Sequence, residues 1–153
     1  MSAESEVSNW KYSHFLKNEN NNISKKDIFS VLSKQDIDEA YKIISGWDNY
    51  STTPLITLSK LSKKLKLNKI FYKDESKRFH LKSFKALGGA YAVERVTKGN
   101  KEVVISTATA GNHGRSVAWG SKKLGLKCKI FISEYVSESR AEVMRNFGAD
   151  VIR

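Results

Sequence analysis

The sequence predicts an α/β fold, in which an open parallel sheet carries helices on both faces. From Lys69 to the C-terminus, short runs of β-branched and aromatic residues alternate with segments of helical periodicity. That alternation is typical of parallel strands joined by right-handed helical crossovers. Gly99, Gly125 and Gly148 stand where the helices of this pattern should end, because glycine suits the left-handed residue after a helix. The length of 153 residues fits one domain.

The first part of the chain is expected to precede this domain. Residues 1–34 contain the Asn-rich run KNENNNISKKD, which cannot bury much apolar surface, so we expect a polar, partly disordered segment. The domain is assigned to residues 35–153, with order beginning near Asp36. A short helix is predicted in DIDEAYKIISG, where apolar residues recur at helical spacing and Gly46 provides the stop. Pro54 then favours an extended chain.

The segment KLSKKLKLNK, residues 60–69, is the densest group of positive charge. Its pattern predicts an amphipathic helix with Leu58, Leu61 and Leu65 facing inward and the lysines in solvent. The chain has a net charge of +11, which could attract polyanions, but no nucleic-acid-binding motif accompanies it. We therefore expect a solvated helix face and no nucleic-acid partner.

Four strands and three helices are expected from residue 69 onward. The strands are the runs KIFYKD (69–74), EVVISTA (102–108), CKIFIS (128–133) and ADVIR (149–153), and the helices lie near 84–98, 112–124 and 137–147. Ser139 and Glu142 have the spacing of a capping box at the last helix. Nothing in the sequence would cover the final strand, so we expect an N-terminal portion of a larger architecture.

Composition excludes several classes of protein. No run approaches the roughly 18–20 apolar residues of a membrane span, and the N-terminus lacks the basic start and apolar core of a signal peptide. We therefore expect no membrane partner and take the cytoplasm as the default compartment. Cys128 is the single cysteine, so an intrachain disulfide or a multi-cysteine metal site is impossible, and no metal is expected. Its apolar surroundings predict a core residue.

Two loops at strand ends are the candidate functional segments. KDESKRFHLKSFKALGG leads from one expected strand into a helix, and STATAGNHGRSVAW leads from the next strand into the following helix. Ligands of open α/β sheets bind beyond the carboxyl ends of the strands. The small residues and backbone N–H groups around Gly111 and Gly114 suit a carboxylate or phosphate. Tight helix packing is the alternative role for these two glycines.

Lys85 lies in the first turn of a predicted helix, beside small residues and the helix's positive end. If the fold desolvates this amine, its pKa falls and the amine becomes available as a nucleophile or base. The alternative is a side chain that extends to solvent. The residue pattern by itself leaves both possibilities open.

At these residues the chain resembles the N-terminal region of the diaminopropionate ammonia-lyases. The resemblance is carried by TPL, KIFYKDES, RF, SFKALGGAYAV and STATAGNHGRSVAW, and covers about residues 47–153. These lyases belong to the pyridoxal-phosphate enzymes of the tryptophan-synthase-β type, with serine and threonine dehydratases as cousins. The resemblance implies an incomplete N-terminal portion of a tryptophan-synthase-β-like fold, the cofactor pyridoxal 5'-phosphate, a small amino-acid substrate and a homodimer in the full-length form.

The resemblance also assigns roles to individual residues. Lys85 would form the Schiff base with pyridoxal phosphate, and once freed would take the α-proton of the substrate. Phe84 would pack on one face of the cofactor ring, and Asn112 would hydrogen-bond the cofactor's phenolic oxygen. Loss of the β-substituent would then give pyruvate and ammonia. The loop that grips the substrate carboxylate would consist of Thr109, Ala110, Gly111, Asn112 and His113.

The sequence departs from the family pattern in three places. The ammonia-lyases usually carry an aspartate where this chain has Ala110, so an acid on the opposite face of the α-carbon is missing. His80 and Lys82 replace the glycine and asparagine of the family's RFGLN pattern, and both are expected at the surface. The family binds the cofactor phosphate in a glycine-rich loop of its C-terminal half, beyond Arg153. We therefore expect the chain alone to be inactive or nearly so.

Two other functions stay open from the sequence. A serine or threonine dehydratase is supported by Ala110, because these cousins have a small residue there. A noncatalytic remnant whose basic charge binds anionic partners is the alternative outside enzymology.

Overall fold

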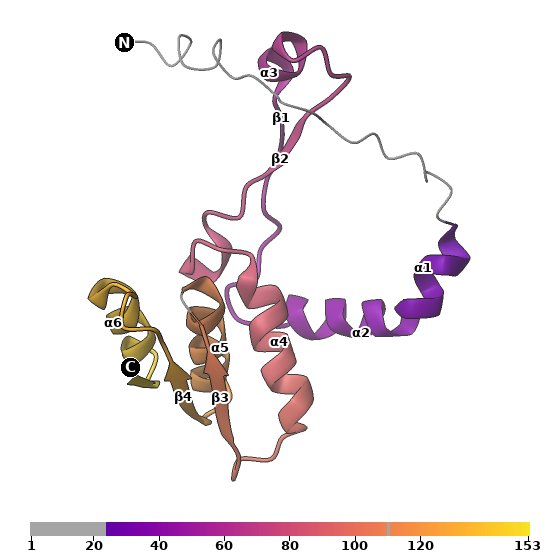
Figure 1. Cartoon of the computed structure of the whole chain (residues 1–153). Helices are drawn as coiled ribbons and strands as arrows, with labels where there is room; N and C mark the ends of the chain where they lie inside the picture. The colour runs from indigo at the N-terminus through magenta and orange to yellow at the C-terminus, as the bar shows by residue number, and fades with distance from the viewer. Residues whose placement is uncertain (1–23, 110) are drawn as a thin grey trace, which may run out of the picture. The chain divides into compact units, whose positions relative to one another are not determined.

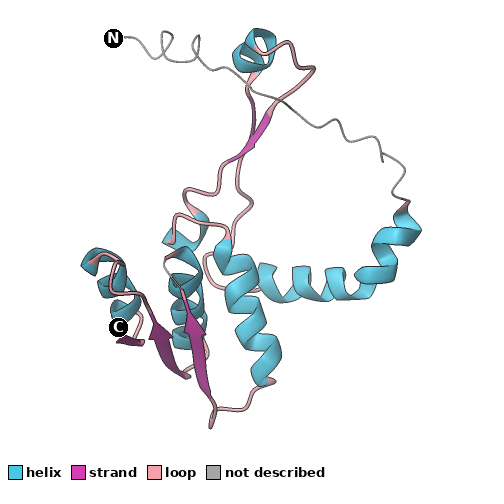
Figure 2. Cartoon of the chain, viewed as in Figure 1, coloured by secondary structure: helices cyan, strands magenta, loops and turns pink. Residues whose placement is uncertain are grey.

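The computed structural model describes residues 24–109 and 111–153, whose helices and strands are shown in Figures 1 and 2. The chain divides after Ile37 into two compact units. The first unit contains α1 (Lys25–Val31) and the beginning of α2 (Lys34–Ser45), and the second contains all later elements. The expectations for residues 1–23 lie outside the described part.

Helical order begins earlier than the sequence predicted, because a capping box starts α1. The N–H of Asp27 donates to Ser24 Oγ at 3.2 Å, and the N–H of Ser24 donates to Asp27 Oδ2 at 2.9 Å. These bonds satisfy N–H groups of the first turn, and those from Ser24 hold the pKa of Asp27 below its usual range. Ser33 and Asp36 exchange the same pair of bonds at the start of α2, the helix predicted near Asp36.

A two-stranded antiparallel sheet follows α2. It consists of β1 (Leu55–Thr57) and β2 (Phe71–Lys73), with α3 (Ser59–Lys64) between them. The prediction that 69–74 is the first strand of the parallel sheet is therefore wrong, because β1 lies close enough along the chain to pair with β2 through a short connection. The predicted inward orientation of Leu61 and Leu65 is also wrong. Both side chains are exposed, because the two-stranded sheet offers no layer to cover them.

The parallel sheet contains the three remaining predicted strands. These are β3 (Val104–Ala108), β4 (Lys127–Phe131) and β5 (Asp150–Ile152), adjacent in that order. Helices α5 (Asn112–Lys123) and α6 (Glu138–Asn146) form the crossovers, and α4 (Lys85–Thr97) precedes β3. The α/β fold with a parallel sheet is confirmed.

Helices α5 and α6 lie against one face of this sheet, whereas the sequence predicted helices on both faces. Ile130 and Cys128 are buried in the core with Met144 of α6, while Val104 and Phe131 on the opposite face are 49% and 44% exposed. The strand order explains this arrangement, since right-handed crossovers between successive strands place both connecting helices on the same face. The predicted core position of Cys128 is confirmed, and burial raises the pKa of its thiol.

The helix ends follow the glycine pattern at all three predicted sites, with Gly99 at φ 81° directly after the C-cap of α4, and depart from the capping pattern at one. Gly125 and Gly148 have φ of 65° and 84° directly after the C-caps of α5 and α6, as the sequence predicted. The capping box expected at Ser139 is wrong, because α6 already begins at Glu138 after Ser137. In the part of the chain that the structure describes, no helix is long and apolar enough to cross a membrane.

Helices α4 and α5 touch along their backbones. A Cβ added to Gly120 would lie 2.7 Å from Ala90 Cα, and one added to Gly89 would overlap the side chain of Ser116. Residue numbers rise together along both contacts, so the helices run parallel and start at the same end, as Figure 1 shows. One turn before Gly89 and Ser116 lie the first residues of the two helices, which the sequence singled out as Lys85 and Asn112.

Replacing Gly120→Ala should destabilise this contact. The new methyl would meet the backbone of Ala90, which cannot move without shifting α4, so we expect the free energy of unfolding to fall by about 1–3 kcal/mol. Chemical denaturation followed by circular dichroism measures the change. Gly88→Ala is the matched control, since no atom lies within 4 Å of its added Cβ and alanine favours helix by up to about 1 kcal/mol. Equal effects of the two substitutions would contradict the backbone contact.

Candidate active site

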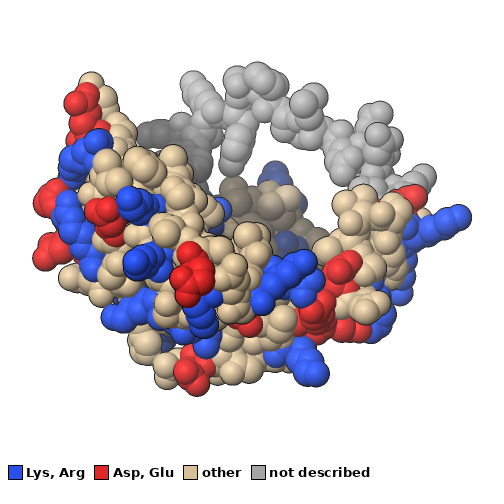
Figure 3. All heavy atoms as spheres, turned by 90° about the horizontal axis from the view of Figure 1, so that it is seen from below, with Lys and Arg blue, Asp and Glu red and all other residues tan. Residues whose placement is uncertain are grey.

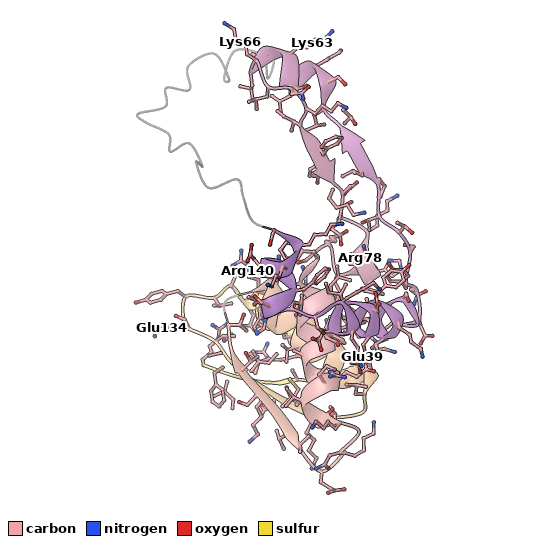
Figure 4. All side chains as sticks on the ribbon, turned by 90° about the vertical axis from the view of Figure 1, so that its right-hand side faces the viewer. Glu39, Lys63, Lys66, Arg78, Glu134 and Arg140 are labelled. Atoms are coloured by element: carbon pink, nitrogen blue, oxygen red, sulfur yellow. The ribbon has the colours of Figure 1, made fainter. Side chains whose placement is uncertain are left out.

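Arg78, labelled in Figure 4, anchors the loop that leads into α4. Its buried guanidinium donates to Ser51 O at 2.7 Å and to Thr53 Oγ1 at 3.1 Å, and forms an ion pair with Glu75 at 2.7 Å. These charge-assisted bonds hold the pKa of the Glu75 carboxyl below its usual range. Because the guanidinium is fully engaged, the loop is tied to the segment before β1.

The chain after Arg78 has an unusual backbone. Phe79, His80 and Lys82 have φ of 47°, 59° and 53°. A left-handed residue with a Cβ costs roughly 1–2 kcal/mol, so this short stretch stores strain. His80 and Lys82 are exposed, as the sequence predicted.

Aromatic packing holds the strained turn. The ring of Phe79 is stacked on Trp119 of α5 at 4.9 Å and tilted against Trp47 at 5.8 Å. Leu81 is buried in the same cluster. Backbone strain persists where the surrounding packing overdetermines it. The turn that delivers the chain to α4 is therefore fixed by contact with α5.

Lys85 is the first residue of α4. Its N–H donates to Oγ of the buried Ser83 at 3.2 Å, which satisfies one N–H group of the first turn. Its side chain is exposed, with Nζ 5.0 Å from the ring centroid of Phe84, itself 57% exposed. The described residues do not desolvate this amine, so within this chain the solvent-exposed alternative holds.

Thr109 organises the loop between β3 and α5. Its hydroxyl oxygen accepts from the N–H of Gly111 at 3.3 Å and from that of Gly114 at 3.2 Å, which caps a helix whose own N-cap is glycine. A Cβ on Gly114 would overlap Thr109 and lie 2.7 Å from Met144 Sδ, whereas Gly111 has open space. Tight packing therefore accounts for Gly114 but not for Gly111.

Asn112 and His113 face different cavities. Asn112 is exposed, and its Oδ1 accepts from Arg115 at 2.7 Å. A cavity of about 450 Å³ is lined by Gly111, Asn112, Arg115, Ser139, Arg140 and Val143. His113 lines a second, largely apolar cavity of about 470 Å³ between α4 and β3. Lys85 lines neither cavity.

The structure thus brings some of the predicted site residues together. Lys85 and Asn112 occupy the first turns of adjacent parallel helices, and Gly111 shares a cavity with Asn112. His113 points elsewhere, and Ala110 lies outside the described residues. Arg115 and Arg140 were missed by the sequence analysis. Arg115 could have been noticed, because it follows Asn112 by three residues and such pairs meet on one side of a helix; Arg140 comes close only through the fold.

The exposed groups fit the chemistry of an aldehyde cofactor. An amine that bonds an aldehyde must be accessible and outside an ion pair, and among the described residues Lys85 takes part in no ion pair. The adjacent Phe84 offers a flat apolar surface, and Asn112 offers an amide within the neighbouring first turn. In the described ranges no three His, Cys, Asp or Glu side chains gather as a metal site.

Charge does not form a single-sign patch on the face seen in Figure 3. Acidic side chains lie among the lysines and arginines there. Exposed ion pairs such as Arg95–Glu39 and Arg145–Glu138 also place opposite charges together. A surface of mixed sign is weak as a nucleic-acid footprint.

Comparison with known proteins identifies relatives of the described fold. Residues 47–153 match the family described as pyridoxal-phosphate dependent enzyme. A diaminopropionate ammonia-lyase of Salmonella typhimurium is 40% identical over 124 residues, covering 67% of this chain and 31% of the relative. An L-threonine dehydratase of Staphylococcus aureus is 33% identical over 122 residues, covering 80% of this chain and 34% of the relative.

A solved structure agrees with these sequence matches. The crystal structure of diaminopropionate ammonia-lyase from Escherichia coli in apo form superposes with a TM-score of 0.70 at 35% identity, covering 75% of this chain and 35% of the other. The chain spans about a third of the length of the curated relatives it matches.

Substituting the strained positions should stabilise the loop before α4. Lys82→Asn places a residue that tolerates the left-handed region at φ 53°, so we expect the free energy of unfolding to rise by about 0.5–1 kcal/mol. His80→Gly should give a smaller gain, because glycine adds entropy to the unfolded chain. Lys77→Asn, at φ −104°, is the control without strain to relieve. Equal changes in the denaturation midpoints of Lys82→Asn and Lys77→Asn would show that the left-handed backbone at Lys82 does not destabilise the fold.

Proposed function

The chain belongs to the family of pyridoxal-phosphate dependent enzymes, and from that premise we propose that it supplies the reactive lysine and the substrate loop of an ammonia-lyase that acts on 2,3-diaminopropionate. One observation carries the proposal. The backbones of α4 and α5 touch one turn beyond Lys85 and Asn112, so both residues stand at the same end of the parallel layer. Ligands of open α/β sheets bind at that end.

Each proposed role has a structural basis. Lys85 would hold the cofactor's aldehyde carbon through its accessible Nζ, with Phe84 beside it as an apolar surface. Asn112 would donate to the cofactor's phenolic oxygen from the neighbouring helix. The loop of Thr109, Ala110, Gly111, Asn112 and His113 would bind the substrate carboxylate, with Thr109 keeping the start of α5 in shape.

The proposed chemistry is elimination followed by hydrolysis. When bound, pyridoxal phosphate supplies an electron sink for negative charge at the substrate's α-carbon. Lys85 Nζ, as a free amine, would take the α-proton, and ammonia would leave the β-carbon. Adding one water to the remaining three-carbon unit releases the second ammonia and pyruvate, so one diaminopropionate and one water give one pyruvate and two ammonia.

A serine or threonine dehydratase is the second candidate. It is favoured by Ala110, where the ammonia-lyases usually carry an aspartate, and by the similarity to the Staphylococcus aureus threonine dehydratase. The same lysine and loop would serve, with water as the leaving group instead of ammonia. The higher identity to the Salmonella typhimurium ammonia-lyase supports the first candidate.

We also propose a cytoplasmic homodimer for the full-length form, without a nucleic-acid partner. The absence of a membrane-spanning helix among the described residues and the mixed charge seen in Figure 3 are compatible with this setting. A noncatalytic remnant that binds anions through its basic charge is the remaining alternative. Support for this alternative would require that the protein shift the mobility of nucleic acid in a gel in a salt-sensitive way.

Lys85 should be the residue labelled by the cofactor. The protein is incubated with pyridoxal phosphate, reduced with borohydride and mapped by peptide mass spectrometry. We expect the label at Lys85 in the unmodified chain and in Lys82→Arg, and its loss in Lys85→Arg, because the exposed Nζ beside Phe84 and Asn112 is the proposed attachment point. Label spread evenly over surface lysines would refute the assignment.

Substrate preference should separate the two enzyme candidates. Ammonia release is measured with 2,3-diaminopropionate, L-serine and L-threonine, on this chain and on the chain extended by the C-terminal part that the relatives carry. We expect release with diaminopropionate above that with serine or threonine, only in the extended polypeptide, with a loss of about 10²–10⁴-fold in Lys85→Arg. Higher release from threonine would favour the dehydratase.

A further inference from the structure

The cavity between the starts of α5 and α6 has a strongly positive lining. Of its six lining residues, two are arginines and none is acidic. Arg115 comes from the first turn of α5, and Arg140 from the first turn of α6. Figure 4 shows Arg140 at the end of the α/β layer opposite the turn that joins α4 to β3. Both arginines therefore line one space at the carboxyl ends of the strands.

Glu138, two residues before Arg140 on α6, is engaged elsewhere. Glu138 forms ion pairs with Arg145 and, at 2.7 Å, with Arg153, and the hydrogen bonds from these arginines lower the pKa of its carboxyl. It is not among the residues that line the cavity. Its charge therefore faces other partners, and Glu142 of α6 does not line the cavity either.

The remaining lining residues are suited to a small oxyanion. Ser139 brings a hydroxyl group, and Gly111 has open space where a Cβ would stand. Arg115 already donates one N–H to Asn112 Oδ1 at 2.7 Å, which leaves other N–H groups of its planar fork for a second acceptor. Guanidinium groups bind carboxylate and phosphate in bidentate geometry.

We propose that Arg115 and Arg140 form an oxyanion subsite that binds the carboxylate of the amino-acid substrate. The inference rests on the proposed function, because the cavity shares Gly111 and Asn112 with the predicted carboxylate loop. The two arginines add fixed positive charge to a loop that otherwise offers backbone N–H groups. They select substrates that carry an oxyanion and are substrate-binding residues of this chain.

Nuclear magnetic resonance of the ¹⁵N-labelled chain tests the subsite without cofactor, at constant ionic strength. The chain is titrated with 2,3-diaminopropionate and with 1,2-diaminoethane, which keeps both amines and lacks the carboxylate. We expect saturable shifts of the Arg115 and Arg140 Nε–H signals and of the Gly111 and Ser139 amides with diaminopropionate only. Equal shifts with both compounds, or none with either, would overturn the proposal.

Substitutions test whether the two arginine side chains bind the carboxylate. Arg115→Gln and Arg140→Gln should each weaken the apparent Kd by about tenfold or more, since a hydrogen bond to a charged group contributes about 1.5–3 kcal/mol. Arg115→Lys and Arg140→Lys keep the positive charge but lose the planar guanidinium. Their apparent Kd should lie between that of the unmodified chain and that of the glutamine variants, which shows that the glutamine variants do not fail merely by misfolding. Arg95→Gln, outside the cavity and paired with Glu39, should bind as the unmodified chain does.

A titration with inorganic phosphate distinguishes a subsite for the substrate carboxylate from a subsite for a free anion. If inorganic phosphate saturates the cavity signals while diaminopropionate does not, the subsite belongs to a free anion and the substrate assignment is wrong. Borohydride labelling is repeated on Arg115→Gln and Arg140→Gln, where we expect Lys85 to stay labelled. A labelled Lys85 without cavity shifts would refute the subsite alone, and cavity shifts without a labelled Lys85 would refute the cofactor site alone.

Discussion

The direct backbone contact between α4 and α5 is the constraint on which the candidate site depends. Gly89 and Gly120 let the two helices approach until atoms of Ser116 and Ala90 occupy the space that larger residues would need. Helices this close behave as one rigid pair, because neither can rotate without a clash. Since both helices begin one turn before this contact, their first residues are held at one end of the layer. Chemistry that needs an amine and an amide from different parts of the chain becomes possible there.

Strain and packing act together in the loop that leads to this pair. A buried arginine fixes the start of the loop, and the stacking of Phe79 on Trp119 fixes its middle. The left-handed backbone of Phe79, His80 and Lys82 costs free energy that the aromatic cluster offsets. His80 and Lys82 occupy positions where the family pattern has glycine and asparagine, residues that adopt this backbone more easily. The chain keeps the turn and gives up part of its stability there.

The surface around Lys85 and the cavity between α5 and α6 differ in their electrostatics. Around Lys85 the surface is open, with an exposed aromatic ring and no ion pair among the described residues. Between α5 and α6 the lining is arginine-rich and has no acidic residue. In the proposed function, the cavity would attract the carboxylate of an amino acid, and the amine of Lys85 would serve its other end. The exposed Val104 and Phe131 leave the second sheet face without cover from the described residues.

From local periodicity and backbone preference, the sequence alone predicts the parallel strands after residue 100, the three helices beside them and the glycine stops of α4, α5 and α6. It also singled out Lys85 and Asn112, through motifs that are continuous in the chain. Contacts across the fold set three further features: residues 71–73 pair with β1 instead of joining the parallel sheet, α5 and α6 cover one face of that sheet, and α6 begins at Glu138 after Ser137. Likewise Arg140 shares a cavity with Arg115 only because α6 packs beside α5. Pairing partners, layer order and clusters of side chains depend on contacts between residues far apart in the chain, which no local pattern records.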